Sequence, residues 1–321
     1  MDLHLLVDNL TNPALLFFFL GLIAVQVKSD LAIPPSSSKF ISLYLLFSIG
    51  FKGGQELAHS EWGYEIVFSL IFGVLLALIV PVYTFFILKK KLGVQNAAAI
   101  AAAYGSVSAV TFVTAVSFLD MEAIPYNGYM VAVMAIMEAP SIIIGVLLMS
   151  LFSVTKASNL NMGSIVKHSV TNGSVMLILG SLVIGFLAND AQATGIAPFT
   201  TDIFKGFLAV FLLDMGIASG KKIGSLKDYG AFPYIFAIAI PIINGVIVCF
   251  LSALITDEIG NRFLFAILAA SASYIAVPAA MKLAAPDANE GLYLPMALAI
   301  TFPFNITFGM PLYMYLIQVF P

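Results

Sequence analysis

The stretch Ile49-Gly50-Phe51-Lys52-Gly53-Gly54 returns 166 residues later (216 − 50) as Met215-Gly216-Ile217-Ala218-Ser219-Gly220. This separation is about half of the 321-residue chain. Two further pairs keep nearly the same separation: Ser106-Val107-Ser108 with Ser271-Ala272-Ser273, and Glu138-Ala139-Pro140 with Phe302-Pro303-Phe304. If each half crosses a membrane an odd number of times, the two copies have opposite orientations, as in many secondary transporters. The repeat therefore predicts two inverted halves with a binding site between them.

The composition indicates that lipid surrounds most of this chain. Hydrophobic residues make up 61% of it and charged residues 10%, with a mean hydropathy of +1.03, whereas a soluble domain carries roughly 25% charge. In lipid the backbone must satisfy its own hydrogen bonds, which favours a helical bundle. The single Cys249 allows neither an internal disulfide nor a cysteine metal site. We expect no nucleic-acid partner and no cofactor.

Ten apolar segments approach the length of about 20 residues that a crossing helix needs. They are residues 13–27, 38–54, 64–88, 94–118, 128–153, 172–188, 203–220, 230–255, 262–283 and 291–319. We therefore predict an all-α membrane protein in which residues 1–155 form the first five-helix repeat. Residues 156–171 form a cytoplasmic linker, and residues 172–321 form the second repeat.

The basic residues lie mainly on one side of this ten-span arrangement. Loops on that side contain eleven of the 14 basic residues, while the other side keeps Lys205 and Arg262, and Lys52 lies within a segment. Lysine and arginine favour cytoplasmic loops. We therefore expect a cell-membrane protein with both termini outside the cytoplasm. The eleven residues are Lys28, Lys39, Lys89, Lys90, Lys91, Lys156, Lys167, Lys221, Lys222, Lys227 and Lys282.

Small and hydroxyl residues gather in the fourth and ninth spans. Gly105, Ser106, Ser108 and Thr111 lie in one, and Ser271, Ser273 and Tyr274 lie in the other. Local unwinding would expose carbonyls to a cation and amides to an anion. We predict that these residues bind the substrate, with Ser108 and Ser273 facing each other across a pseudo-two-fold axis. The alternative is that the hydroxyls only join helices.

Two carboxylates interrupt apolar segments. Glu138 lies in Met137-Glu138-Ala139-Pro140 and Asp214 in Leu213-Asp214-Met215. Such groups are costly in a membrane unless they are paired, protonated or in contact with water, so we predict that they couple transport to an ion. A structural role for Glu138 near the Pro140 break is the alternative. The sequence has no His-Glu-x-x-His, Gly-x-Ser-x-Gly, P-loop or Cys-x-x-Cys motif, and an intramembrane hydrolase would need Glu138 and Asp214 to lie together.

At these motifs the chain resembles, over nearly its whole length, the cyanobacterial sodium-dependent bicarbonate transporter family known as SbtA. Family members carry I-G-L-T-G-G-like, G-A-V-S-G-S-T, M-D-I-P, M-G-M-E-A, A-A-S-S-S-D-I-S-G-P and S-A-N stretches. The similar stretches here are Ile49 to Gly54, Gly105 to Thr111, Met137 to Pro140, Met215 to Ser219, Ala269 to Pro278 and Asp287 to Asn289.

The resemblance implies ten helices in two inverted repeats, a core and a gate domain, and crossed helices 4 and 9 around bicarbonate and sodium. It also implies a homotrimer. Val110, Tyr274 and Ala276 replace oxygen-bearing family residues, so Na⁺ is possible but we expect weak sodium coupling, with Glu138 as the coupling group. The short 154–171 segment argues against a PII-like regulator. We predict a small-anion permease and no enzyme; the alternative is a non-transporting sensor or scaffold of the same fold.

Overall fold

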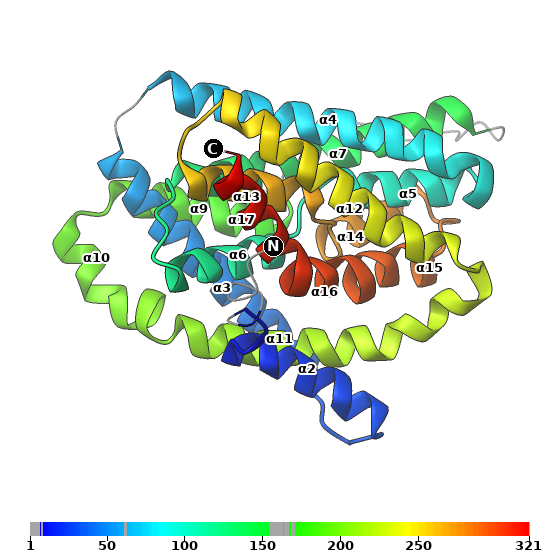
Figure 1. The fold of residues 1–321 in the computed structure, drawn as a ribbon, viewed down its shortest axis with the longest axis horizontal. Coiled ribbons are helices and arrows are strands. Elements are labelled where there is room, and N and C mark those ends of the chain that lie inside the picture. The colour runs from blue at the N-terminus through cyan, green and yellow to red at the C-terminus, as the bar shows by residue number, and fades with distance from the viewer. Residues whose placement is uncertain are drawn as a thin grey trace.

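The computed structural model describes residues 7, 9–60, 63–153, 163, 167 and 171–320, and the regular structure among them is helical, with no strand (Figure 1). The α-helices are α2 (Pro13–Gln26), α3 (Pro35–His59), α4 (Tyr64–Leu92), α5 (Val94–Gly105), α6 (Ala109–Met121), α7 (Tyr129–Phe152), α9 (Gly173–Leu187), α10 (Asp190–Ala197), α11 (Phe204–Lys222), α12 (Phe232–Leu251), α13 (Ile259–Ala270), α14 (Ala276–Ala284), α15 (Glu290–Pro295), α16 (Phe302–Phe304) and α17 (Met310–Val319). Wider π-helical turns occupy Pro198–Asp202, Met296–Thr301 and Asn305–Gly309, and tighter 3₁₀ turns occupy Ile223–Tyr229 and Ser252–Leu254.

Helices of membrane-spanning length confirm an all-α, multi-pass membrane protein. Among the described residues, six helical segments are long and apolar enough to cross a bilayer, and α2, α9 and α13 are shorter apolar helices. The count of ten crossings and the inversion of the two halves stay predictions. The predicted linker 156–171 lies almost wholly outside the described residues. The six segments are Tyr64–Leu92, Val94–Met121, Tyr129–Phe152, Asp190–Tyr229, Phe232–Leu254 and Glu290–Val319.

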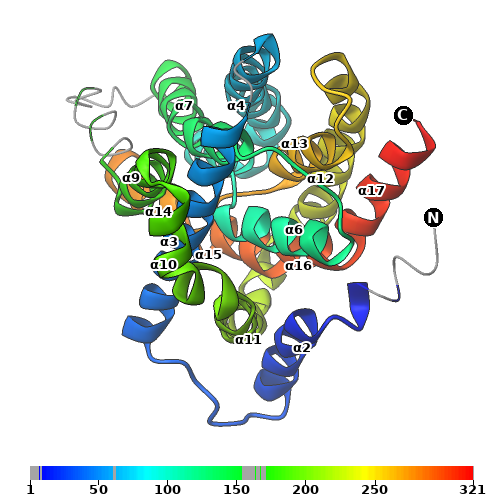
Figure 2. The ribbon, with the colours of Figure 1, turned by 90° about the vertical axis from the view of Figure 1, so that its left-hand side faces the viewer.

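The helices pack in two groups. In one group α3 lies along α9 and α11 lies along α2; in the other, α4 packs on α5 and α7, and α12 packs on α13 and α17. Figure 2 views the bundle nearly end-on and shows α2 and α11 well apart from α4 and α7. In an 18-residue window of the interrupted span Val94–Met121, 89% of the residues are buried, whereas the share in such a window of Tyr64–Leu92 is 39%. The broken helix is therefore central, and α4 is peripheral.

The repeated glycines are the points where helix backbones touch. A methyl group at Gly54 would overlap the Leu182 carbonyl oxygen of α9, and one at Gly216 would overlap the Phe18 carbonyl oxygen of α2. The partner helices contribute glycines of their own, because Gly185 and Gly21 are equally close to the backbone opposite. Small residues permit such close approach between membrane helices. The two copies of the glycine motif therefore make the same kind of contact, α3 with α9 and α11 with α2.

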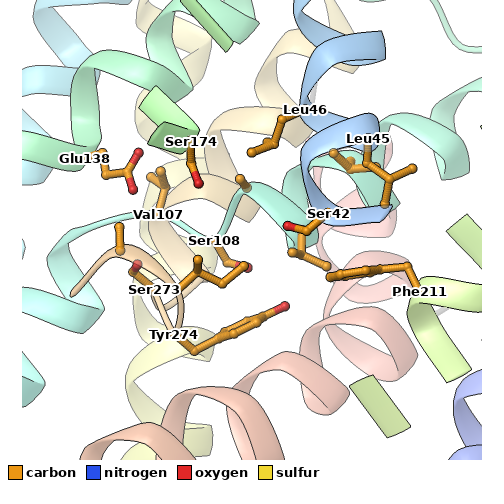
Figure 3. Close-up of a pocket in the computed structure, with 15 residues that line it drawn as sticks. Ser42, Leu45, Leu46, Val107, Ser108, Glu138, Ser174, Phe211, Ser273 and Tyr274 are labelled. Atoms are coloured by element: carbon orange, nitrogen blue, oxygen red, sulfur yellow. The ribbon is translucent and has the colours of Figure 1, made fainter. Parts of the chain in front are cut away.

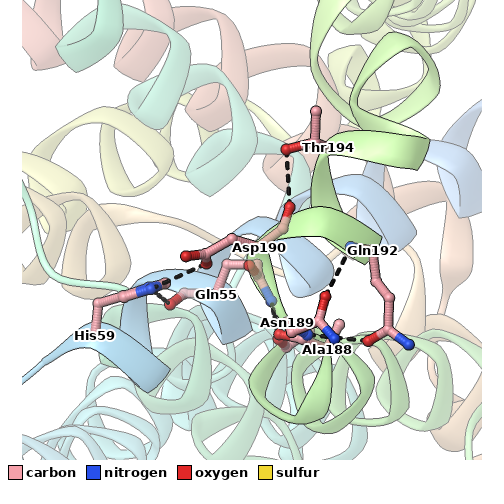
Figure 4. A network of polar contacts seen from close by, with 8 residues as sticks. Gln55, His59, Ala188, Asn189, Asp190, Gln192 and Thr194 are labelled. Carbon is pink, nitrogen blue, oxygen red and sulfur yellow. Dashed lines mark hydrogen bonds and ion pairs between the residues drawn. The ribbon is translucent and has the colours of Figure 1, made fainter.

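Polar contacts at the end of α3 fix the turn between α9 and α10 (Figure 4). The Gln55 side-chain amide donates to the carbonyls of Gly185 and Ala188. His59 Nε2 lies 3.2 Å from Asp190 Oδ1, at the start of α10. This end of α3 is therefore attached to the α9–α10 turn by side chains, in addition to the glycine contacts between α3 and α9.

We expect Gly216→Ala to destabilise the protein and Gly206→Ala, on the same helix, to leave stability unchanged or slightly higher. The first methyl group meets the α2 backbone, which cannot move aside as a side chain can, whereas nothing lies within 4 Å of the second. Overpacking of this kind costs about 1–3 kcal/mol. The measurement is the midpoint of thermal unfolding in detergent. Equal midpoints for the two variants would contradict the close α2–α11 contact.

Candidate functional site

Two helices are interrupted at the serine segments that the sequence singles out. α5 ends at Gly105 and α6 begins at Ala109, while α13 ends at Ala270 and α14 begins at Ala276. Ser106 and Ser271, the first residues beyond α5 and α13, are both extended, with ψ of 177° and 167°. The Ser108 hydroxyl then accepts a hydrogen bond from the Thr111 amide at 3.1 Å and caps the new helix. The serine-rich sequence thus ends one helix and starts the next.

The two breaks are hydrogen-bonded to each other. The Ser108 amide donates to Ser271 Oγ at 3.0 Å, and the Ser273 amide donates to the Ala103 carbonyl oxygen at 2.8 Å. Ser271 Oγ in turn donates to the Leu268 carbonyl oxygen at 2.9 Å. These bonds join segments about 165 residues apart in the sequence, and they bring the predicted fourth and ninth spans together at their unwound points.

Side chains from neighbouring helices satisfy the carbonyl groups at the ends of α5 and α13. Ser141 donates to the Ala102 carbonyl at 2.9 Å. Asn244 and Asn305 donate to the carbonyls of Ala269 and Ala270 at 3.1 and 2.8 Å. An unsatisfied carbonyl in a membrane interior costs several kcal/mol, so these amides and hydroxyls stabilise the breaks.

A small cavity lies against both breaks (Figure 3). Its free volume is about 20 Å³, enough for about one water molecule, so a solute of a few heavy atoms needs the lining to move apart. Figure 3 shows Glu138 on one side and Phe211 on the other, with serine side chains between them. The lining combines both breaks with α3, α7, α9 and α11; it consists of Ser42, Leu45, Leu46, Val107, Ser108, Ala109, Val110, Val113, Glu138, Ser174, Phe211, Ser273, Tyr274, Ile275 and Ala276.

The cavity contains some of the predicted site residues. Ser108, Ser273, Tyr274 and Glu138 line it. The Tyr274 hydroxyl is buried and, among the described residues, has no hydrogen-bond partner. The cavity therefore brings one serine from each break together with the predicted coupling carboxylate.

Other predicted residues lie behind the lining or away from it. Ser271 holds the two breaks together, and the buried hydroxyls of Ser106 and Thr111 make no hydrogen bond within the described part of the chain. Gly105 lies where a methyl group would overlap Pro81 and Ser141. Asp214 is not part of the lining. It accepts a hydrogen bond from Ser38 at 2.5 Å, so the structure does not bring it to Glu138 as an acid pair.

Sequence reasoning missed the lining that comes from the surrounding helices. Ser42 of α3, Ser174 of α9 and Phe211 of α11 complete the cavity. Each is an ordinary residue of an apolar segment, with no charge, break or repeated motif to mark it. Only the packing of α3, α9 and α11 against the breaks decides which of their residues face the cavity.

We expect Ser271→Ala to lower the stability of the protein and Ser106→Ala to change it little. Ser271 Oγ accepts the Ser108 amide and donates to a carbonyl, so its removal leaves buried groups unsatisfied, at a cost of about 1–3 kcal/mol. The Ser106 hydroxyl, in the matching segment, has no partner to lose among the described residues. Thermal unfolding in detergent measures both. A Ser106→Ala variant as unstable as Ser271→Ala would contradict this assignment of the bonds.

Comparison with known protein families gives a match over nearly the whole chain. The family model of the Na⁺-dependent bicarbonate transporter superfamily matches residues 13–318. No curated protein sequence matches the chain. The matched region contains both helix breaks, Glu138 and both copies of the glycine motif. The chain therefore belongs to the Na⁺-dependent bicarbonate transporter superfamily.

Proposed function

We propose that this protein is a secondary transporter that binds a small anion, bicarbonate in the first place, in the cavity between the two helix breaks. The observation that carries the proposal is that the first turns of both α6 and α14 line one cavity, through Ala109, Val110 and Ala276. Amides in the first turn of a helix have no partner within that helix, and the helix dipole places partial positive charge there. Two such ends facing one void attract an anion.

The other polar groups of the cavity fit the same solute. Ser42, Ser108, Ser174 and Ser273 carry hydroxyls, each of which can donate one hydrogen bond. The void is small, and apolar side chains such as Leu45 and Phe211 restrict its size. A planar oxyanion of a few atoms can accept hydrogen bonds from several sides at once. A large organic anion does not fit this space.

A non-transporting sensor or scaffold would be favoured by a dry, apolar contact between the two breaks. The void between them is lined mainly by apolar side chains, but four serine hydroxyls and the Glu138 carboxylate also line it, and these polar groups support transport. The reciprocal glycine contacts, α3 with α9 and α11 with α2, support two inverted repeats. We propose that this group of helices is the gate domain and that it moves against the helices carrying the breaks, in a cell-membrane homotrimer with both termini outside.

We further propose that sodium coupling is weak and that Glu138 couples anion transport to a proton. Val110, Tyr274 and Ala276 supply no carboxylate at the cavity, and several of the carbonyls at the breaks already accept hydrogen bonds. Glu138 is the carboxylate that lines the void. Ionised, it would repel an anion beside it; protonated, it would admit one. Anion and proton would then cross together.

The transport proposal predicts counterflow of labelled bicarbonate in proteoliposomes that contain the purified protein. We expect exchange with unlabelled bicarbonate, competition from small oxyanions and no competition from large organic anions, because the void is small. Empty liposomes and liposomes with the Gly206→Ala variant are the negative and positive controls. Absence of flux for bicarbonate and for every small anion tested would overturn the proposal and favour the sensor or scaffold.

The coupling proposal predicts that replacing sodium by choline changes uptake little, whereas uptake falls as the pH of the medium rises. Uptake falls with rising pH because only protonated Glu138 admits the anion, and Glu138 loses its proton at higher pH. Glu138→Gln, which cannot ionise, should remove this pH dependence at constant anion concentration. Asp214→Asn is the matched control and should keep the wild-type profile, since Asp214 lies outside the cavity lining. Steep sodium dependence, with Glu138→Gln behaving as wild type, would contradict the proposal.

A further inference from the structure

A second cavity, of about 190 Å³, lies farther along the helices that line the first. On α3 the lining passes from Leu45 and Leu46 in the first cavity to Ser48 and Lys52 in the second. On α6 it passes from Val113 to Val116, and on α11 from Phe211 back to Phe204 and Lys205. The two voids are thus about one helical turn apart along α3 and α6 and about two turns apart along α11.

Lysines outnumber carboxylates in the lining of the second cavity, and Glu56 lies close enough to interact with the Lys52–Asp120 pair from behind it. Its ionisable lining residues are Lys52, Asp120 and Lys205. Lys52 Nζ lies 3.2 Å from Asp120 Oδ2, and both side chains are about one-third exposed. Among the described residues, no carboxylate lies within ion-pair distance of Lys205. One lysine is therefore balanced by Asp120, and the other is available to a ligand.

A buried hydroxyl completes the cavity. Ser48 lines it, is 1% exposed, and has an Oγ without a hydrogen-bond partner in the described part of the chain. An unpartnered buried hydroxyl costs free energy unless a ligand or water bonds to it. The cavity therefore offers an ammonium group at its exposed end, and behind its inner wall a hydroxyl that a rotation of the Ser48 side chain would bring to the void.

The charge pattern of the sequence gives an independent reason to single out these lysines. In the ten-span arrangement only Lys52, Lys205 and Arg262 lie away from the lysine-rich cytoplasmic side. Arg262 is buried, and its guanidinium donates to the carbonyls of Cys249 and Phe320 at 3.1 and 2.9 Å. The two remaining lysines lie on different helices, α3 and α11, yet they meet in one cavity.

We propose that this cavity is an outer anion-capture site, which binds a small inorganic oxyanion from the external medium before it reaches the inner cavity. Lys205 supplies the charge, the Lys52–Asp120 pair shapes the wall, and Ser48 donates a hydrogen bond. A charged, partly enclosed site raises the local concentration of oppositely charged solutes. The claim that the captured anion is also the transported one rests on the proposed function. The existence of the capture site is independent of that function.

The test uses a cysteine at Thr201, an exposed residue of the cavity wall. The native Cys249 is buried and 1% exposed. Any reaction with an added thiol reagent is therefore expected at the new cysteine. In intact cells we compare its rates of reaction with an anionic and a cationic membrane-impermeant thiosulfonate. If the Lys205 charge lies about 10 Å from the reacting thiol in water, it changes the rate of each reagent about twofold, in opposite directions. Lys205→Gln should therefore lower the ratio of the anionic rate to the cationic rate about fourfold. Lys222→Gln, at the other end of α11, should leave the ratio unchanged.

Two further measurements complete the experiment. Bicarbonate should slow the anionic reagent more than chloride at equal ionic strength, and this protection should be weaker in Ser48→Ala. In transport assays Lys205→Gln should raise the KM for external anion and leave the maximal rate unchanged. An unchanged rate ratio in Lys205→Gln, or equal protection by chloride and bicarbonate, would overturn the capture site. A shifted ratio in a protein that transports no anion would keep the capture site and reject the proposed function.

Discussion

The structure depends on the hydrogen bonds between two interrupted helices. The Ser108 amide is bonded to Ser271 Oγ, and the Ser273 amide is bonded to the Ala103 carbonyl. A break in a membrane helix exposes polar backbone where lipid cannot hydrogen-bond to it, so it persists only where protein satisfies it. Here each break satisfies part of the other. Neither interrupted helix would be stable at this place without its counterpart.

The same requirement explains the polar residues that surround the breaks. Ser141, Asn244 and Asn305 come from three other helical segments, and each donates to a carbonyl at an interrupted helix end. The carbonyl ends of α5 and α13 are thereby satisfied by side chains, while residues of the first turns of α6 and α14 line the cavity. The Ser108 and Ser273 hydroxyls cap one amide of each of these turns, those of Thr111 and Val277. Side chains from the breaks and from their neighbours therefore satisfy much of the backbone that the interruptions expose.

The helices that close the cavity on its other side are held together differently. α3 with α9, and α11 with α2, touch backbone to backbone at glycines. Residues of α3, α9 and α11 line the first cavity together with residues of the hydrogen-bonded breaks. The second cavity follows the same boundary between α3, α11 and α6. Both voids therefore lie where two differently built groups of helices meet.

The sequence by itself determined that most of the chain lies in a membrane, that its structure is helical, and where the helix breaks lie. High hydropathy excludes a soluble fold, and the segments at Ser106 and Ser271 interrupt helices because serine, glycine and proline compete with or prevent helical hydrogen bonds. Ser108, Ser273, Tyr274 and Glu138, which line the first cavity, were predictable as candidates because a motif or an isolated charge marks them. Only the tertiary structure decided the rest. Ser42 and Ser174 line the first cavity although no local pattern marks them, and Asp214 lies outside it. Lys52 and Lys205 line the second cavity together. These positions depend on packing between distant helices, which, unlike helix formation, leaves no local pattern in the chain.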